Sequence, residues 1–552
     1  MPGRLSGRLS FATMTTHCKC KPSAKRESHR QIRIWLLAVI IFGGTPAGFG
    51  QNATHELTRS ENRSTRVFIT KIQTTLPGSL HEYSVPGEAV ALIRGGEVVW
   101  TEGFGFADLS ARIPMTTETE FNVGSLSKTP TAWAIMQMVD DGNLKLDAPV
   151  DTYLRRWHLP PSSFDNKEVT IGRLLSHTAG ISEHGYHGWD PTSPLPPIED
   201  SLAGKTGTGA VQVVSTPGAA YHYSGANYAI LALVIEEVSG RPFSAYMESQ
   251  IFRPLHMLHT NYGLPTDFEK SMAKPYDALE NPLPILRYNE FAAAGLTTNI
   301  HDLAIFAAGG LKSKTGAQPG RGLVRPETIA EMQSPQANTK WANDDPFGPS
   351  PQYGYGYTVR PEQFAGKTGV GHGGTNNGWE GLLQIIPSTG DGIVILTNSS
   401  NGSAVIASVL CDWRQWAAGT NQQVPCPAIE ARIPLLRAYR SGGTADAVSL
   451  YRRLRQNESA KYDFSSFELN SLGYQVMRMG DGAGAIEIFK LNVDQFPQEW
   501  NVYDSLGEAY LKLGNKPEAI KNYKRSLELN PNNENGRGAL KSLGAPVDHN
   551  TN

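Results

Sequence analysis

Ser125 and Lys128 stand three residues apart in the stretch FNVGSLSKTPTAW, residues 121–133. A serine hydroxyl is a weak nucleophile at neutral pH and needs a neighbouring base. On a helix, side chains at i and i+3 share a face, so the Lys128 amine can reach the Ser125 hydroxyl. The positive end of the helix favours negative charge on that oxygen. The spacing permits an activated nucleophile, but taken alone it does not decide. The alternative is a helix cap beside a surface lysine.

Further motifs follow this pair in a fixed order. They are GNLKLDAPVDTYL (142–154), TIGRLLSHTAGI (170–181), YHYSGANYAILALVIEEVSGRPF (221–243), AAAGLTTNIHDLAIF (292–306) and GHGGTNNGWEGLLQIIP (371–387). Together with the Ser125 stretch they resemble the serine β-lactamase-like superfamily, and most closely its branch of class C β-lactamases, DD-peptidases and esterases. The resemblance covers about residues 85–400 and includes several motifs in the right order, which makes it far more specific than S-x-x-K alone.

The resemblance implies an α+β fold, with a five-stranded antiparallel sheet flanked by helices and an all-helical lobe. It also implies that Ser125 is the acylated nucleophile, with Lys128 as its neighbouring amine and Tyr223 as the tyrosine of the family's Tyr-x-Asn element. A phenol with a pKa of about 10 is a weak base, and we expect a nearby cation such as Lys128 to lower that pKa. The alternative for Tyr223 is a core aromatic.

Two departures from the family pattern concern substrate binding. Gly225 stands where the family has an asparagine that grips a substrate amide, and Asn227 is the substitute that the sequence offers. The Lys-Thr-Gly triplet occurs at 205–207, 314–316 and 367–369, but the ungapped alignment up to Pro387 starts at His372. We therefore expect His372, Gly373 and Gly374 in the triplet position.

The backbone N–H groups of Ser125 and Thr375 would form the oxyanion hole. A neutral imidazole at His372 brings no full charge, and Gly373 has no hydroxyl, so carboxylate substrates should bind poorly. The sequence thus predicts an exported serine hydrolase that acts on carboxylic esters without a cofactor. The alternatives are a penicillin-recognising DD-peptidase or β-lactamase that acts on cell-wall-type substrates, and a non-catalytic scaffold protein.

Local patterns predict the elements that position these residues. Strands on either side of Gly95-Gly96 should form a hairpin over 88–108, and two more strands should flank the turn at 388–390. Helical periodicity follows Ser125 as far as Gly142, and again up to Gly240. Strands from both ends of the domain, with helices between them, predict a sheet built from both ends and covered by helices.

The first fifty residues resemble an export signal. Many Lys and Arg residues precede the apolar run IWLLAVIIF at 34–42, and small residues follow as far as Gly50. This pattern predicts a signal peptide over 1–50 that is cleaved near Gly50, and the alternative is a membrane anchor at 34–42. Of the four cysteines, Cys411 and Cys426 would remain after cleavage, either as a disulfide or as two free thiols.

The end of the chain repeats itself. Residues around 472–497 align without gaps with residues 34 positions later, and Gly480 matches Gly514 while Ala485 matches Ala519. The period resembles tetratricopeptide repeats. We therefore expect a hydrolase domain over 51–425, a helical linker over 426–465 that contains part of a third unit, and repeats over 466–545. The repeats would bind a protein partner or pack on the hydrolase domain.

Composition excludes other classes of function. The chain has 552 residues and a net charge of −2, which gives no electrostatic reason to expect nucleic acid as a partner. No Cys/His cluster has zinc spacing, and we interpret His184 and His187 as loop or pocket-lining residues. Neither a metal nor an organic cofactor is expected.

Overall fold

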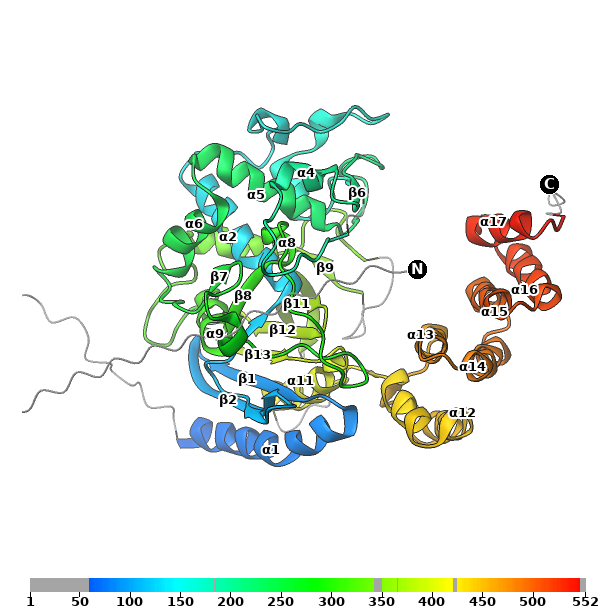
Figure 1. The fold of residues 1–552 in the computed structure, drawn as a ribbon. Helices are drawn as coiled ribbons and strands as arrows, with labels where there is room; N and C mark the ends of the chain where they lie inside the picture. Colours follow the sequence, from blue (N-terminus) through cyan, green and yellow to red (C-terminus); the bar gives the residue numbers. More distant parts are fainter. Residues whose placement is uncertain (1–58, 183–184, 342–349, 365, 420–423, 547–552) are drawn as a thin grey trace, which may run out of the picture. The chain divides into compact units, whose positions relative to one another are not determined.

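The computed structural model describes residues 59–182, 185–341, 350–364, 366–419 and 424–546 (Figure 1). The predicted signal peptide, its cleavage site near Gly50, the alternative anchor at 34–42 and His184 all lie outside these residues. Within the described ranges, no helix is both long and apolar enough to cross a membrane.

An antiparallel sheet forms the centre of the catalytic part, in the order β3-β2-β1-β13-β12-β11-β10-β9. The strands are β1 (Gly87–Arg94), β2 (Glu97–Asp108), β3 (Ile113–Pro114), β9 (Gln352–Tyr353), β10 (Thr358–Phe364), β11 (Lys367–Asn376), β12 (Trp379–Ile386) and β13 (Asp391–Thr397). The pairing of β1 with β13, at Glu88 opposite Thr397, confirms that both ends of the domain build the sheet. In the described residues this sheet has eight strands rather than the expected five, and its edges are the two-residue strands β3 and β9.

The turns form where the sequence predicted them. Gly95 and Gly96 have φ values of 57° and 73°, the left-handed region that glycine adopts without strain, and they join β1 to β2. Gly390, with φ 75°, ends the turn between β12 and β13. Since β1 is buried along almost its whole length, it lies in the middle of the layers.

Helices cover both faces of the sheet, as the resemblance implied. On one face lies the helical lobe, and on the other lie α1 (Arg59–Tyr83) and α11 (Gly402–Ala418), which pack on each other (Figure 1). The lobe and its surroundings contain α2 (Lys128–Asp140), α3 (Ile171–Leu175), α4 (Ile198–Leu202), α5 (Gly225–Ser239), α6 (Phe243–Met247), α7 (Phe268–Ser271), α8 (Phe291–Ala294), α9 (Ile300–Gly309) and α10 (Pro326–Met332). Each face has its own apolar core. The α+β fold class is confirmed.

Small sheets brace the lobe. One has the order β4-β8-β7, with β4 (Glu120–Asn122), β7 (Asn261–Tyr262) and β8 (Leu296–Asn299), and another joins β5 (Ala203–Gly204) to β6 (Gly209–Ala210). The β4 strand leads directly into the Ser125 turn, and the backbone N–H of Val123 donates to the carbonyl of Leu296 at 3.0 Å. The chain is therefore held on both sides just before the nucleophile.

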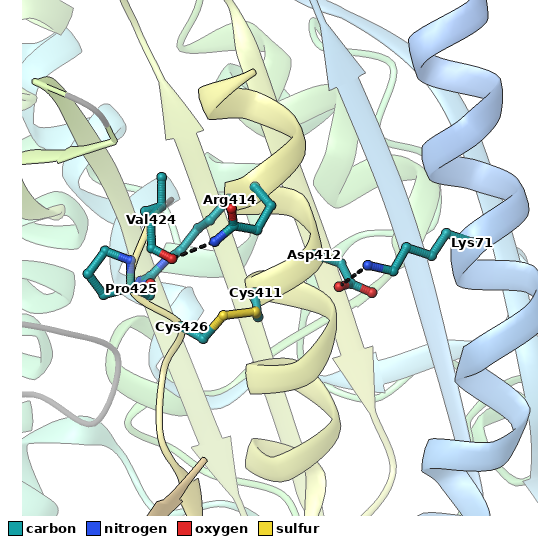
Figure 2. Close-up of a disulfide and its surroundings, with 8 residues drawn as sticks. Lys71, Cys411, Asp412, Arg414, Val424, Pro425 and Cys426 are labelled. Atoms are coloured by element: carbon teal, nitrogen blue, oxygen red, sulfur yellow. Dashed lines mark hydrogen bonds and ion pairs between the residues drawn. A yellow bond between two sulfur atoms is a disulfide. The ribbon is translucent and has the colours of Figure 1, made fainter. Parts of the chain in front are cut away.

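A disulfide joins Cys411 to Cys426, which decides between the two expectations for these residues (Figure 2). It fastens α11 to the segment that leads to the C-terminal helices. Arg414 and Gln415 of the same helix donate to the carbonyls of Pro425 and Val424 at 3.3 and 2.5 Å. On the other side of α11, Asp412 forms an ion pair with Lys71 of α1 at 2.7 Å (Figure 2).

The C-terminal helices form successive pairs. They are α12 (Arg432–Asn457), α13 (Ser466–Arg478), α14 (Gly482–Gln495), α15 (Trp500–Lys512), α16 (Lys516–Leu529) and α17 (Glu534–Ser542), and the two-residue strands β14 (Ile429–Glu430) and β15 (Tyr462–Asp463) flank α12. Gly480 and Gly514 take left-handed turns at equivalent positions, and Ala485 and Ala519 are fully buried. These features bear out the repeat of 34 residues.

The start of α12 contacts the end of α1. Arg437 donates to the carbonyl oxygens of His81 and Glu82 at 2.7 and 2.9 Å, and Arg440 donates to the carbonyl of Leu279 at 3.1 Å. Ile433 and Leu436 belong to the same apolar core as α11. The first C-terminal helix therefore packs on the hydrolase part.

Candidate active site

Ser125 lies in a short 3-10 turn, η1 (Gly124–Ser127), that runs directly into α2. In a 3-10 turn, side chains at i and i+3 line up. The Lys128 Nζ donates to Ser125 Oγ at 3.0 Å and to the carbonyl of Ala293 at 2.8 Å. Ser125 is not a helix cap and Lys128 is fully buried, so the alternative of a cap beside a surface lysine is wrong.

The environment of Lys128 lowers the pKa of its amine. Burial lowers the pKa of its amine to about 7, because the charged form loses its water. Among the described residues, no carboxylate forms an ion pair with Lys128 to oppose this effect. A large share of the amine is therefore neutral at physiological pH and able to accept the Ser125 proton.

Tyr223 lies beside the same amine but keeps its proton. The Lys128 Nζ lies 5.0 Å from the centre of the Tyr223 ring. Burial raises the Tyr223 pKa above its ordinary value, and a hydrogen bond with Ser125 opposes the rise only in part. The expectation that a nearby cation would make the phenolate available is therefore wrong, since the amine itself loses its charge near neutral pH. The phenol is placed to donate a proton.

His177 is a site residue that the sequence did not single out. It is fully buried, adopts φ 56°, and its ring lies 4.3 Å from that of Tyr223. Its Nδ1 accepts a hydrogen bond from the Asn227 amide at 2.8 Å and one from the backbone N–H of Ser224 at 3.3 Å. The imidazole is thus neutral, and burial lowers its pKa. The His-Thr motif at 177–178 was the signal that could have identified it.

These hydrogen bonds correct the role expected for Asn227. The side chain is fully buried and its amide donates to His177, so it is not placed to bind a substrate amide. Because it lies on the first turn of α5, four residues after Tyr223, its physical role is to hold the imidazole against the Tyr223 ring.

His372 lies on β11 at the pocket, but its ring is engaged within the protein. Nε2 accepts from the Tyr353 hydroxyl at 2.8 Å, and Nδ1 donates to the carbonyl of Gly373. Burial lowers the His372 pKa to about 3, so the ring is neutral as expected. The ring therefore has no N–H left to donate to a substrate.

Gly373 and Gly374, which follow His372, differ in whether a side chain would fit at their positions. A Cβ on Gly374 would overlap the carbonyl of Val123 and lie 3.0 Å from the backbone nitrogen of Leu126, so only glycine lets β11 approach η1. A Cβ on Gly373 would meet nothing closer than 3.9 Å. Position 373, which lines the pocket, therefore has room for a side chain.

The expected oxyanion donors lie on adjoining backbones. Gly124 has φ 51°, and a Cβ on it would lie 2.5 Å from the carbonyl oxygen and 2.9 Å from the nitrogen of Thr375. This close approach brings the residue after Gly124, which is Ser125, next to Thr375, and both line the pocket. The arrangement can present two N–H groups to a developing oxyanion.

A cavity of about 480 Å³ contains these groups. Its lining includes Ser125, Tyr223, His372, Gly373, Gly374 and Thr375, together with Tyr221, Trp341, Thr358, Arg360, Glu380, Gly381, Leu382 and Ile406. The rings of Tyr221 and Trp341 stack with centroids 5.5 Å apart. Residues 367–369, the third Lys-Thr-Gly triplet, begin the same strand but do not line the cavity.

Arg360 is a charged lining residue that the sequence did not single out. It extends from β10 and is only 6% exposed, although it borders the pocket. Its charge contributes to lowering the His372 pKa. Nothing in the local sequence indicated this position, because the register of β10 on β11 places it there.

Comparison with known proteins agrees with this geometry. The family model described as Beta-lactamase matches residues 70–408, and a tetratricopeptide repeat model matches residues 505–533. The chain is 28% identical over 341 residues to "Putative penicillin-binding protein PbpX" of Bacillus subtilis (strain 168), a match that covers 60% of this chain and 74% of that protein. It is 25% identical over 345 residues to "Protein flp" of Staphylococcus aureus (strain MRSA252), with 59% of this chain and 62% of that protein covered.

A solved structure gives the same result for the fold. The octameric penicillin-binding protein homologue from Pyrococcus abyssi matches with a TM-score of 0.54 and 28% identity, over 67% of this chain and 81% of that chain. The match to the Staphylococcus protein covers less than two thirds of that protein. The Beta-lactamase family model ends at residue 408, so the C-terminal helices of this chain lie largely outside it.

Proposed function

The chain belongs to the beta-lactamase family, and we propose that it is an exported serine hydrolase that forms an acyl-enzyme on Ser125 and acts on uncharged carboxylic esters. The observation that carries this proposal is the buried Lys128 amine, which has a pKa of about 7 and donates to Ser125 Oγ at 3.0 Å at the edge of a cavity. No cofactor is needed, because acyl transfer to serine requires only a nucleophile, proton transfer and oxyanion stabilisation.

Acylation follows from the positions of three side chains. The neutral Lys128 amine takes the proton of Ser125 as Oγ attacks the ester carbonyl carbon, and a bond forms between them. The backbone N–H groups of Ser125 and Thr375 hold the resulting oxyanion. When the tetrahedral intermediate collapses, the Tyr223 phenol donates its proton to the leaving alkoxide and regains one from the Lys128 ammonium.

Deacylation reverses the roles of the same groups. Water enters on the side that the alcohol left and loses a proton to Tyr223 and Lys128 as it attacks the acyl carbon. The second tetrahedral intermediate releases the acid and returns the proton to Ser125 Oγ. The buried pair of His177 and Asn227 touches neither reacting atom, and it serves to fix the Tyr223 ring.

The β11 side of the cavity supports esters as substrates. His372 is neutral and both of its ring nitrogens are engaged within the protein, while Gly373 has no hydroxyl. Positions 372 and 373 therefore offer a carboxylate neither an ammonium nor a hydroxyl donor. An uncharged ester needs neither, and the stacked Tyr221 and Trp341 offer an apolar wall.

One observation favours the second candidate function, a penicillin-recognising DD-peptidase or β-lactamase. The Arg360 guanidinium lines the same cavity, and a guanidinium binds a substrate carboxylate well. Two relatives are also named as a penicillin-binding protein or its homologue. On this alternative, Arg360 would take the role that the family assigns to the lysine of its triplet.

A paired assay distinguishes these functions. The wild-type protein is incubated with a fluorophosphonate probe, and kcat/KM is measured on p-nitrophenyl butyrate and on nitrocefin. We expect the probe on Ser125, by peptide mass spectrometry, and a higher kcat/KM on the ester. Ser125→Ala should lose both labelling and turnover, whereas undiminished turnover in this variant would contradict the assignment.

The same assay on Arg360→Gln tests the second candidate function, a DD-peptidase or β-lactamase. If Arg360 binds substrate carboxylates, this variant loses nitrocefin turnover and keeps most ester turnover, while Arg360→Lys retains both. Wild-type protein that prefers nitrocefin over the ester would replace our proposal with the second candidate. A protein that neither reacts with the probe nor hydrolyses either substrate would favour the non-catalytic scaffold.

We also propose that the protein is exported after cleavage of residues 1–50. The disulfide between Cys411 and Cys426 supports this location, since such bonds persist in oxidising compartments. We propose that the rest of the chain consists of a hydrolase domain over 51–425, a helical linker over 426–465, and repeats over 466–545. The repeats would bind a protein partner. Mass spectrometry of the exported protein would find its first residue near Gln51, whereas an intact segment 34–42 would favour the anchor.

A further inference from the structure

Position 225 requires glycine because of a neighbouring side chain, and not because of its own backbone conformation. It is the first residue of α5, after the N-cap Ser224, and its φ is not in the left-handed region. The backbone there would accept any residue. A Cβ at this position would instead overlap the hydroxyl of Tyr186 and lie 2.8 Å from its Cε1 atom. The Tyr186 phenol thus occupies the space that a side chain at position 225 would need.

The loop that carries Tyr186 is held in place. Backbone hydrogen bonds join Trp189 and Arg287 in both directions at 2.8 Å, and Arg287 also donates to the carbonyl of Pro191 at 2.9 Å. The Tyr186 ring meets Tyr288 edge to face, with centroids 6.5 Å apart. The phenol therefore has a defined position, to which Gly225 is matched.

This position adjoins the Ser125 site. Gly225 follows Tyr223 by two residues, and Tyr223 lines the cavity that contains Ser125. Burial, together with the nearby Tyr223 and Glu290, raises the pKa of Tyr186, so its hydroxyl is neutral. Where a carboxamide at 225 could offer a donor and an acceptor to a substrate amide, the chain places a phenol that fills the space.

We propose that Tyr186 is a specificity-determining residue, which restricts the acyl groups transferred to Ser125 to those without an acylamino substituent beside the scissile carbonyl. An acylamino group beside the scissile carbonyl would need the space at position 225 that the Tyr186 phenol already fills, whereas a plain alkyl acyl group does not need it. The inference rests on the proposed function, because it concerns the acyl substrate of Ser125.

Matched esters test this inference. The substrates are p-nitrophenyl propionate, p-nitrophenyl 2-acetamidopropionate, which adds only the acylamino group, and p-nitrophenyl isobutyrate, which controls for branching at the same carbon. Rates are corrected with Ser125→Ala, which measures spontaneous hydrolysis. We expect the wild-type protein to favour propionate over the acetamido ester.

The decisive variant is Tyr186→Ala with Gly225→Asn, which removes the phenol and supplies a carboxamide. The ratio of kcat/KM for the acetamido ester to that for propionate should rise by about tenfold, the worth of one hydrogen bond or slightly more. The ratio for isobutyrate should stay within a factor of about two of the wild-type value. The control is Tyr186→Phe with Gly225→Asn, in which the ring still blocks position 225, and its acetamido ratio should not rise.

Thermal unfolding tests the packing separately. Gly225→Asn alone should lower the Tm by a few degrees, about what overpacking produces in a domain of this size, and the loss should persist with Tyr186→Phe but shrink with Tyr186→Ala. An equal loss in all three backgrounds would overturn the overlap on which the inference rests. An unchanged acetamido ratio in the decisive variant would overturn the specificity role.

These failures are distinguishable from a failure of the proposed function. If Ser125→Ala hydrolyses the three esters as fast as the wild-type protein, the proposed function itself is wrong. If Ser125→Ala is inactive but Tyr186→Ala with Gly225→Asn keeps the wild-type ratio, Ser125 chemistry stands and the role of Tyr186 does not.

Discussion

The Lys128 amine donates to Ser125 Oγ at 3.0 Å and to the carbonyl of Ala293 at 2.8 Å. The second contact matters as much as the first, because the carbonyl fixes the amine beside the hydroxyl without adding a negative charge that would hold its proton. Burial then lowers the Lys128 pKa to about 7. In this site the lysine is therefore better suited to act as the base than Tyr223, whose pKa is raised.

The pH dependence of hydrolysis should report this lysine. The reactive form is the neutral amine, so kcat/KM on p-nitrophenyl butyrate should rise with pH through an apparent pKa near 7 and fall away below it. His372→Gln should leave this limb in place, since the His372 pKa of about 3 lies far below it. Rates taken at the isosbestic wavelength of p-nitrophenol, from pH 5 to 9, would check both statements. If His372→Gln lacked this rise of kcat/KM near pH 7, the titrating group would be the histidine.

Replacement of Lys128 should cost far more than its hydrogen bond. We expect Lys128→Met to lower kcat/KM by about a hundredfold or more, because positioned proton transfer contributes at least that much. Lys128→Arg should be similarly slow, since a guanidinium stays charged and cannot accept a proton. Steady-state kinetics with circular dichroism as a check of folding would measure this. An active Lys128→Arg enzyme would show that the base lies elsewhere.

Tyr223→Phe should affect the step that needs a proton donor. The phenol keeps its proton, so its removal should slow the release of poor leaving groups more than good ones. We expect kcat to fall about a hundredfold on an alkyl ester and much less on a p-nitrophenyl ester. Equal losses on both esters would indicate that Tyr223 acts before the leaving group departs.

Asn227→Ala should weaken the fold around His177 and leave substrate selectivity unchanged. The amide donates to a fully buried imidazole whose Nδ1 keeps only the Ser224 N–H in this variant, and the loss of one hydrogen bond costs about 1 kcal/mol. The Tm should fall, while the ratio of ester to nitrocefin turnover should stay constant. A changed ratio with an unchanged Tm would restore Asn227 to the substrate-binding role that the sequence suggested.

Gly373→Thr should shift selectivity toward carboxylate substrates. The space beside Gly373 is open to 3.9 Å, so the new side chain fits and brings a hydroxyl donor to the cavity. A neutral hydrogen bond is worth about 1 kcal/mol, which corresponds to a rise of about fivefold in relative nitrocefin turnover. Gly374→Thr serves as the opposite control, because a side chain there would overlap the Val123 carbonyl and should abolish activity. If Gly373→Thr and Gly374→Thr were equally active, the close contact of β11 with η1 would be contradicted.

Truncation should separate the repeats from α12. A chain that ends after residue 465 keeps α12, with its Arg437 contacts to α1, and should retain most esterase activity. A chain that ends after residue 431 exposes the core on which Ile433 and Leu436 pack, and should lose several degrees of Tm. Activity and Tm of the two purified proteins would test this. Loss of activity after removal of residues 466–552 alone would show that the repeats support the active site.

Much of the architecture could be predicted from short stretches of sequence. The Gly95-Gly96 hairpin, the end of α2 near Gly142 and the repeat around Gly480 and Gly514 each depend on local backbone preferences, which neighbouring residues express directly. The S-x-x-K pair could be identified for the same reason, because three residues of helical backbone are enough to bring Ser125 to Lys128.

The tertiary structure decided what those residues can do. Tyr223 and Arg360 lie far from Ser125 in sequence, and only the packing of α5 and of β10 brings them to one cavity. Sequence alone assigned the lowered pKa to Tyr223, but a pKa depends on the water and charge that the whole fold leaves around a group. In the same way, Asn227 and His372 are polar residues at suitable positions whose partners turned out to be protein groups. The sequence determined which chemical groups are present, and the fold decided which of them face the substrate.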